Sequence, residues 1–184
     1  MATKRAVEMD TKLIAQSIVD NVGLIKKAHI EHAKKSDDSV RFHDRSTPYI
    51  IHPIWCAMTI MTETKLPEDL RVNGYQALMW HDVLEDTDFK LPNDMNSEVI
   101  SIIQDMSFDS FEFERELIWQ KPTFIRLLKL YDKTSNLLDA SHLTDHKWDA
   151  YVDFTQRLIM DAEQNYGELN IVKISKSIAG YRQR

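Results

Sequence analysis

The sequence predicts an all-α protein that folds as a single domain over residues 1–184. Apolar residues recur at steps of three and four almost throughout, which is the spacing of one helix face. Sustained strand-like alternation, internal repeats and low-complexity segments do not occur in the sequence. With 184 residues, of which 43% are hydrophobic and 28% charged, the chain is long enough to bury a core and fits one ordinary domain.

Prolines and capping residues mark where several helices begin. Pro53 suits a first helical turn, where its missing N–H is not needed, and Pro122 stands in front of another helix. Asn73 is the expected N-cap of the third helix, and Asn96 or Ser97 caps the fourth. Together with the apolar stripes, these signals predict helices over residues 10–33, 53–64, 73–86, 98–106 and 124–138.

The last part of the chain, residues 146–184, reads as a helical tail. One helix is expected over 148–166, where Gly167 stops it, and a last helix over 171–178 ends near Gly180. A loop is expected at residues 36–48 and a turn at 91–94, and no structure is assigned to residues 107–119.

Composition excludes several classes of function. The 23 basic and 29 acidic residues give a net charge of −6, which argues against an extended nucleic-acid surface but allows a local basic pocket. The four glycines are too far apart to form a dinucleotide-binding turn or a P-loop. The single Cys56 excludes an internal disulfide and suits a reducing compartment. No apolar run is long enough to cross a bilayer or to act as a signal peptide, so a cytoplasmic protein without a membrane partner is expected.

The most informative segment is an acidic helix end at residues 80–88. On a helix His81 lies one turn from Glu85, and Asp82 lies one turn from Asp86, so four polar side chains gather there. Carboxylates near a helix C-terminus face the negative end of the helix dipole, which a bound divalent cation would offset. The alternative is a solvated helix end followed by an acidic turn, because acidic runs are common.

Two further segments carry side chains that could complete a metal site. His52 lies between apolar residues and a helix-starting proline, and Asp132 lies one turn before Asn136 in a strongly apolar helix. Taken singly, His52 has an ordinary explanation as a core or loop histidine, and Asp132 as an ion-paired surface acid. Taken with His81 and Asp82, they supply two imidazoles and two carboxylates, a mixed donor set that suits a divalent transition metal.

Three extended blocks of the sequence contain these side chains. They read Pro-Tyr-Ile-Ile-His-Pro at 48–53, His-Asp-Val-Leu-Glu-Asp-Thr at 81–87 and Lys-Leu-Tyr-Asp-Lys-Thr-Ser-Asn-Leu at 129–137. In this order the blocks resemble the HD superfamily of metal-dependent phosphohydrolases. The finer match is to the hydrolase domain of RelA/SpoT proteins and their small stand-alone relatives, including the metazoan SpoT homologues. The resemblance covers residues 28–140 and implies an HD-type helical bundle.

The resemblance implies a metal centre and its ligands. His52, His81, Asp82 and Asp132 match the four metal ligands of the family, which usually holds one Mn²⁺ ion there. Fe, Co and Zn stay open as alternatives, because imidazole and carboxylate ligands admit all of these metals. Such a metal lowers the pKa of its bound water from 15.7 towards about 7 and polarises a phosphoryl oxygen, so no covalent nucleophile is needed.

The resemblance also implies catalytic and substrate-binding residues. Glu85 and Asp86 match the acidic pair that orients or deprotonates the attacking water, a role worth about 10²–10⁴-fold in rate. Asn136 matches a residue that lines the nucleotide pocket. The cations that could steady the substrate phosphates are Arg41, Arg45, Lys129 and Lys133. The implied substrates are the alarmones guanosine tetra- and pentaphosphate (ppGpp and pppGpp), which would lose their 3′-pyrophosphate.

Three departures from the family's pattern keep other functions open. Asp44 lies between Arg41 and Arg45, and Trp80 and Tyr131 replace smaller residues. The two aromatic residues either pack in the core or reshape the pocket for another nucleotide, such as a deoxynucleotide or NADPH. A further hypothesis is a catalytically silent domain that senses a nucleotide. The sequence is also compatible with a homo-oligomer.

Overall fold

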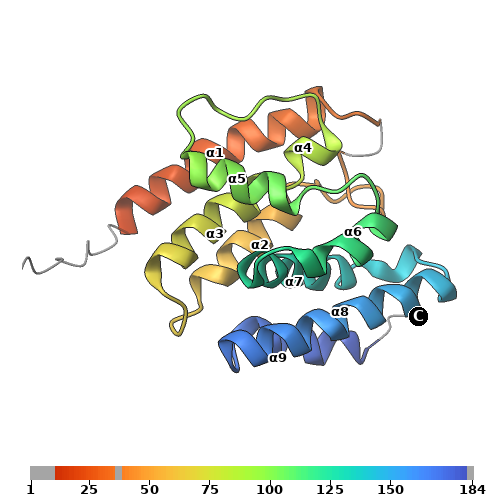
Figure 1. The fold of residues 1–184 in the computed structure, drawn as a ribbon. Coiled ribbons are helices and arrows are strands. Elements are labelled where there is room, and N and C mark those ends of the chain that lie inside the picture. Colours follow the sequence, from red (N-terminus) through yellow and green to blue (C-terminus); the bar gives the residue numbers. More distant parts are fainter. Residues whose placement is uncertain (1–10, 36–38, 182–184) are drawn as a thin grey trace, which may run out of the picture.

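The computed structural model describes residues 11–35 and 39–181 (Figure 1). These residues form helices and isolated β-bridges but no strand, which confirms the all-α prediction. Asp10, the expected start of the first helix, lies outside the described residues, as do 36–38 of the expected loop and 182–184 of the expected tail. Among the described helices, none combines the length and the apolar character that a bilayer crossing requires.

The helices of the described residues follow one another along the chain with short connections. They are α1 (Thr11–Glu31), α2 (Ile51–Met61), α3 (Glu68–Trp80), α4 (Val83–Asp86), α5 (Ser97–Met106), α6 (Phe111–Leu117), α7 (Thr123–Leu137), α8 (Asp145–Tyr166) and α9 (Asn170–Ala179). Short 3₁₀ turns follow α6 at Ile118–Gln120 and α7 at Ala140–His142.

The central helix of the bundle is α7. It packs against α2 and α3 on one side and against α8 and α9 on the other (Figure 1). A helix that is covered on most of its circumference needs apolar residues all round, and Leu127, Leu128 and Leu130 supply them. Asp132 and Lys133 are buried on the same helix. Because a buried charge is costly unless it is paired, these two side chains must find partners inside the protein.

Two helix ends carry the caps that the sequence predicts. At the start of α5, the side chain of Asn96 accepts a hydrogen bond from the backbone N–H of Glu98 at 2.8 Å. Gly167 ends α8 with a φ of +75°, which glycine adopts without strain. That helix begins at Asp145, earlier than the expected residue 148.

The helix predicted over residues 73–86 begins earlier and is interrupted. It starts at Glu68 rather than at Asn73, because Pro67 is extended with a ψ of 144° and acids fill the first turn. Acids are favourable there, since they face the positive end of the helix dipole. The helix then ends before a turn at residues 81–82, and the short α4 follows this turn.

Residues 107–119, to which the sequence assigns no structure, contain α6 and a 3₁₀ turn. The side chain of Ser110 caps α6 by accepting a hydrogen bond from Phe113 N at 3.3 Å. The ring of Phe111 stacks on Tyr151 of α8, with ring centroids 4.9 Å apart. A short helix is therefore held in place by a cap and by aromatic packing rather than by a long apolar stripe.

Glu63, just after α2, holds the start of the C-terminal helix. Its buried carboxylate accepts hydrogen bonds from the backbone N–H groups of Asn170 at 2.8 Å and Ile171 at 2.7 Å. The hydroxyl of Tyr131 donates to the same carboxylate at 3.1 Å. The first N–H groups of a helix have no partner within the helix. Glu63 therefore does for α9 what an N-cap residue does for other helices.

Glu63→Ala is expected to lower the free energy of unfolding by about 3 kcal/mol, because it leaves buried N–H groups and a buried hydroxyl without an acceptor. Urea unfolding followed by circular dichroism measures this change. The control is Glu116→Ala, at an exposed position of α6, which should shift the free energy by less than about 0.5 kcal/mol. A loss below about 1 kcal/mol for Glu63→Ala would show that water replaces the carboxylate at little cost.

Candidate active site

The four side chains predicted to bind metal converge in the interior. His52 comes from α2, His81 and Asp82 from the turn between α3 and α4, and Asp132 from α7, and all four are buried. Ligand atoms of His52, His81 and Asp132 all lie within 4.8 Å of one another. The carboxylate of Asp82 reaches the Nε2 atoms of His81 at 3.1 Å and His52 at 3.3 Å. Segments far apart in the sequence therefore bring two imidazoles and the Asp132 carboxylate together, and the Asp82 carboxylate lies against the imidazoles.

The orientation of the two imidazoles fits a bound cation. The Nδ1 atom of His81 lies 2.8 Å from the carbonyl oxygen of Leu78, so this nitrogen carries the proton and donates it. The Nδ1 atom of His52 lies 2.8 Å from the hydroxyl oxygen of Ser135, and either group can be the donor. The two Nε2 atoms lie 3.2 Å apart. An Nδ1 hydrogen bond of the kind that His81 makes is the usual support of a metal-binding histidine, because it leaves the Nε2 lone pair for the cation.

The charges of these side chains also suit a metal. Burial would raise the pKa of the Asp82 carboxyl, but the imidazoles of His81 and His52 outweigh this effect and hold that pKa well below its usual range. Burial opposes ionisation of Asp132 as well, yet Lys133 and Lys129 lower its pKa. Burial lowers the pKa of His52, which keeps its ring neutral. Carboxylates and neutral imidazoles are the protonation states that metal binding requires.

The predicted acidic pair lies beside this cluster. Glu85 and Asp86 end α4 and both line the neighbouring pocket. The backbone N–H of Phe108 donates a hydrogen bond to Glu85 Oε1 at 3.0 Å, and the Nζ atom of Lys129 lies 3.8 Å from the same oxygen. Burial raises the pKa of Glu85. A carboxylate with a raised pKa is a better proton acceptor near neutral pH, so Glu85 has the properties of a general base.

A lysine side chain offsets the crowded acids at this helix end. Lys34, which follows α1, donates from Nζ to the carbonyl oxygens of Leu84 and Glu85, each at 2.9 Å. These carbonyls belong to the last turn of α4, where the helix dipole is negative. The expected charge compensation at this helix end therefore comes in part from the protein itself.

A pocket of about 300 Å³ adjoins the cluster and is lined by both charged and aromatic side chains. Arg41, Lys133 and Asn136, three of the predicted substrate-binding residues, line it, and so do Asp82 and Asp132 of the cluster. The pocket is therefore large enough for part of a nucleotide and opens directly onto the predicted metal ligands.

Arg41 is engaged by other side chains within this pocket. Its guanidinium pairs with Asp139 through Nε at 2.6 Å and Nη2 at 2.9 Å, and Nη2 also donates to Asn136 Oδ1 at 2.7 Å. Asn136 in turn donates from Nδ2 to Asp132 Oδ1 at 2.7 Å. A continuous hydrogen-bonded chain thus connects Arg41 to a predicted metal ligand. Arg45 has a different place: it is exposed, and its guanidinium lies over the ring of Phe42 at 4.7 Å rather than along the pocket wall.

Comparisons with known proteins agree with this geometry. No family model matches the sequence. The chain is 34% identical over 114 residues to the Danio rerio protein named guanosine-3′,5′-bis(diphosphate) 3′-pyrophosphohydrolase MESH1, and the alignment covers 56% of this chain and 62% of that protein. The Homo sapiens and Mus musculus proteins of the same name are each 29% identical over 126 residues, which cover 63% of this chain and 69% of those proteins. The chain thus spans less than two thirds of the zebrafish relative.

A solved structure shows the same architecture. It belongs to a metazoan ortholog of SpoT that hydrolyzes ppGpp and plays a role in starvation responses, and it matches with a TM-score of 0.64. The sequence identity is 18%, and the match covers 94% of this chain and 96% of that chain. This match shows the fold, which is the helical bundle that the three sequence blocks imply. The named relatives and the shared fold together confirm the resemblance predicted from these blocks.

Two aromatic departures from the family's pattern lie in the core of this HD-type fold. Trp80 is 2% exposed and stacks on Phe89, with ring centroids 6.4 Å apart. Tyr131 is fully buried and donates its hydroxyl to Glu63. Neither residue lines the 300 Å³ pocket. Of the two explanations that the sequence left open, core packing is therefore correct.

The structure adds pocket residues that the sequence did not single out. The hydroxyl of Tyr49 donates to Asp82 Oδ2 at 2.7 Å. Its position in the block at 48–53 was a signal that could have identified it. Tyr151 of α8 and Asp139 also line the pocket, but they lie outside the three blocks and no sequence pattern marks them.

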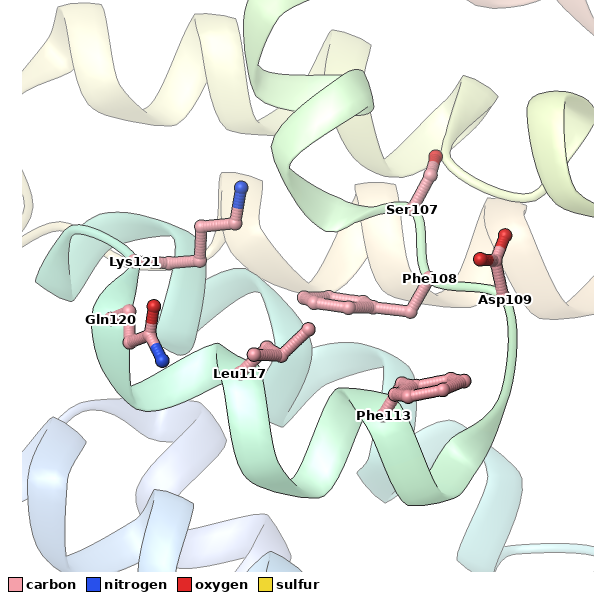
Figure 2. A pocket seen from close by; sticks show the side chains of 7 residues that line it. All are labelled: Ser107, Phe108, Asp109, Phe113, Leu117, Gln120 and Lys121. Carbon is pink, nitrogen blue, oxygen red and sulfur yellow. The ribbon is translucent and has the colours of Figure 1, made fainter.

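A larger cavity of about 540 Å³ lies between the end of α5 and α6, as Figure 2 shows. It is lined by Phe108, Phe113 and Leu117 together with polar side chains, and it contains no member of the metal cluster. Phe108 is its link with the site, because the backbone N–H of this residue binds Glu85. Size alone would therefore have selected the wrong cavity.

Proposed function

We propose that this protein is a metal-dependent phosphohydrolase that removes the 3′-pyrophosphate of ppGpp or pppGpp. The observation that carries this proposal is the convergence of two imidazoles and the Asp132 carboxylate, with Asp82 against the imidazoles, beside a pocket that can hold part of a nucleotide and an acid of raised pKa. The names of the zebrafish, human and mouse relatives support the choice of substrate.

In this proposal His52, His81, Asp82 and Asp132 hold one divalent ion, with Mn²⁺ as the expected metal and Fe, Co or Zn as the alternatives. Such an ion lowers the pKa of a bound water and polarises a phosphoryl oxygen of the substrate. The donor set supports this role because it combines imidazole nitrogens, with the ring of His52 kept neutral by a lowered pKa, and carboxyl groups whose pKa values are lowered.

The chain's own residues supply the acid–base chemistry and the binding of the substrate. Glu85 accepts a proton from the attacking water, and Asp86 helps to orient that water. Lys133 and Asn136 contact the nucleotide from α7, and Arg41 sets the position of Asn136 through their hydrogen bond. Arg45, in the exposed loop before α2, does not line the pocket, and to bind a substrate phosphate its side chain has to leave the ring of Phe42.

The direct test is the release of pyrophosphate from ppGpp by purified protein loaded with Mn²⁺. We expect guanosine diphosphate and pyrophosphate in equal amounts, separated by anion-exchange chromatography, and a loss of activity with a chelator that returns when Mn²⁺ is added. His146→Ala, an exposed position on α8, is the control and should keep full activity.

A panel of other nucleotides distinguishes the alternatives. Deoxynucleotides and NADPH are assayed for phosphate and pyrophosphate separately. If the protein hydrolyses one of these compounds and leaves ppGpp intact, the proposed substrate is wrong but the assignment as a phosphohydrolase stands. Binding of ppGpp without turnover of any compound would identify a sensor instead.

A further inference from the structure

A buried acid on α6 joins two lysines beside the predicted metal ligand Asp132. Glu114 is 4% exposed, and its Oε2 atom lies 2.7 Å from the Nζ atom of Lys133. Its Oε1 atom lies 3.6 Å from the Nζ atom of Lys129, whose side chain is also buried. One carboxylate therefore stands opposite both ammonium groups.

The two lysines contact one particular oxygen of Asp132. Lys129 and Lys133 each place Nζ 3.1 Å from Asp132 Oδ2. The other oxygen, Oδ1, faces His52 Nε2 at 3.6 Å and His81 Nε2 at 3.9 Å. The lysines thus hold Oδ2, whereas Oδ1, which also accepts a hydrogen bond from Asn136 at 2.7 Å, is turned to the imidazoles and keeps a second lone pair for the metal.

The two lysines repel a cation bound to Asp132, and the negative charge of Glu114 reduces this repulsion. Two positive charges behind Asp132 compete with a divalent cation for the same carboxylate and repel it at short range. The Nζ atom of Lys129 lies 3.6 Å from Glu114 Oε1 and 3.1 Å from Asp132 Oδ2, so this buried ammonium has two carboxylates as counter-charges. The negative charge of Glu114 offsets the positive charges of the two lysines. Asp132 Oδ1 therefore stays available to the metal.

We propose that Glu114 is a positioning residue that sets the metal affinity of the site by holding Lys129 and Lys133 and balancing their charge. It acts through the lysines, since it does not line the substrate pocket. This inference rests on the metal centre of the proposed function. It gives a role to Glu114, an acid in residues 107–119, where the sequence assigned no motif.

The test measures Mn²⁺ binding to the metal-free protein by titration calorimetry, independently of turnover. Glu114→Gln keeps the shape of the side chain and removes its charge, and it should weaken Mn²⁺ binding by about 10- to 100-fold, the usual effect of a partner behind a metal ligand. Because Glu114 also holds Lys133, which contacts the nucleotide in the proposed function, the KM for ppGpp is expected to rise as well. Mn²⁺ affinity is therefore the readout that tests the inference. The matched control is Glu116→Gln on the same helix, at an exposed position, which should bind Mn²⁺ like the wild type.

A second change separates charge balance from packing. Adding Lys129→Met to Glu114→Gln removes one of the unbalanced charges, so Mn²⁺ affinity should recover to within about threefold of the wild type. Lys129→Met alone should bind Mn²⁺ at least as tightly as the wild type. If Glu114→Gln does not fold, the Mn²⁺ affinity of Lys129→Met tests the inference in its place. A merely structural role predicts instead that the double variant binds more weakly than Glu114→Gln.

Three results would overturn the inference. Unchanged Mn²⁺ binding by Glu114→Gln, a double variant weaker than that single variant, or weaker binding by Lys129→Met would each exclude charge balance by Glu114. These results leave the proposed function intact as long as the wild-type protein binds Mn²⁺. If the wild-type protein binds no divalent metal, the metal centre fails and the inference falls with it.

Discussion

Asp132→Ala is expected to abolish the binding of Mn²⁺ and, with it, the hydrolysis of ppGpp. The change removes Oδ1, which faces both imidazoles, and it leaves Lys129 and Lys133 beside the site without this counter-charge. The loss of affinity should therefore exceed the 10–100-fold that is typical when an outer partner of a ligand is removed. The measurement is the metal content of the purified protein together with calorimetric titration of the metal-free form.

Asp94→Ala is the matched control for this experiment, because it removes an exposed carboxylate from the turn before α5. It should bind one equivalent of Mn²⁺ like the wild type. His81→Ala is expected to behave like Asp132→Ala, since it removes one of the two Nε2 donors. A full equivalent of tightly bound Mn²⁺ in either variant would refute the assignment of these residues as ligands.

Glu85→Gln is expected to keep the metal but to reduce kcat by about 10²–10⁴-fold. The amide oxygen of glutamine can still accept the hydrogen bond from Phe108 N, so the local structure is retained. It cannot take a proton from water, and this is the function assigned to Glu85. Turnover at saturating Mn²⁺, measured beside metal content, checks both parts of the prediction.

The control for Glu85→Gln is Glu112→Gln, an exposed position on α6. Its kcat and metal content should equal those of the wild type. Undiminished turnover by Glu85→Gln would transfer the role of base to another group, with Asp86 the nearest candidate in the sequence. A loss of Mn²⁺ from Glu85→Gln would instead make Glu85 a ligand.

Most of the helices could be predicted because their apolar positions repeat with the helical period. The stripes that became α5, α7, α8 and α9 are long, and their ends carry recognisable residues such as Asn96 and Gly167. The start of α3 at Glu68 was missed because the sequence analysis assigned Pro67 to a polar link. Proline is also common directly before a helix, as it is here. The helix α6 was missed because it is short, and because its inward-facing residue is the charged Glu114. An apolar stripe cannot reveal a helix that faces lysines.

The convergence of the candidate metal ligands could be predicted where short sequence blocks carry them. His52, His81, Asp82 and Asp132 lie in three blocks whose residue types and spacing are specific, and the structure brings their side chains together. Tyr151 reaches the pocket from α8, and only the tertiary fold brings it there. The pairing of Arg41 with Asp139 was equally inaccessible, since the two residues are far apart in the sequence.

The carboxylate of Glu63 affects how the last helix, α9, can unfold locally. It joins the end of α2, which carries His52, to the first turn of α9, and a hydrogen bond of 2.6 Å between Thr134 and Ser175 ties α9 to α7 beside Asp132. Local unfolding usually starts at a chain terminus that few bonds restrain. Detachment of α9 breaks the bond to Thr134, which lies two residues from the predicted ligand Asp132. We therefore expect the unfolding of α9 and the loss of metal binding to occur together.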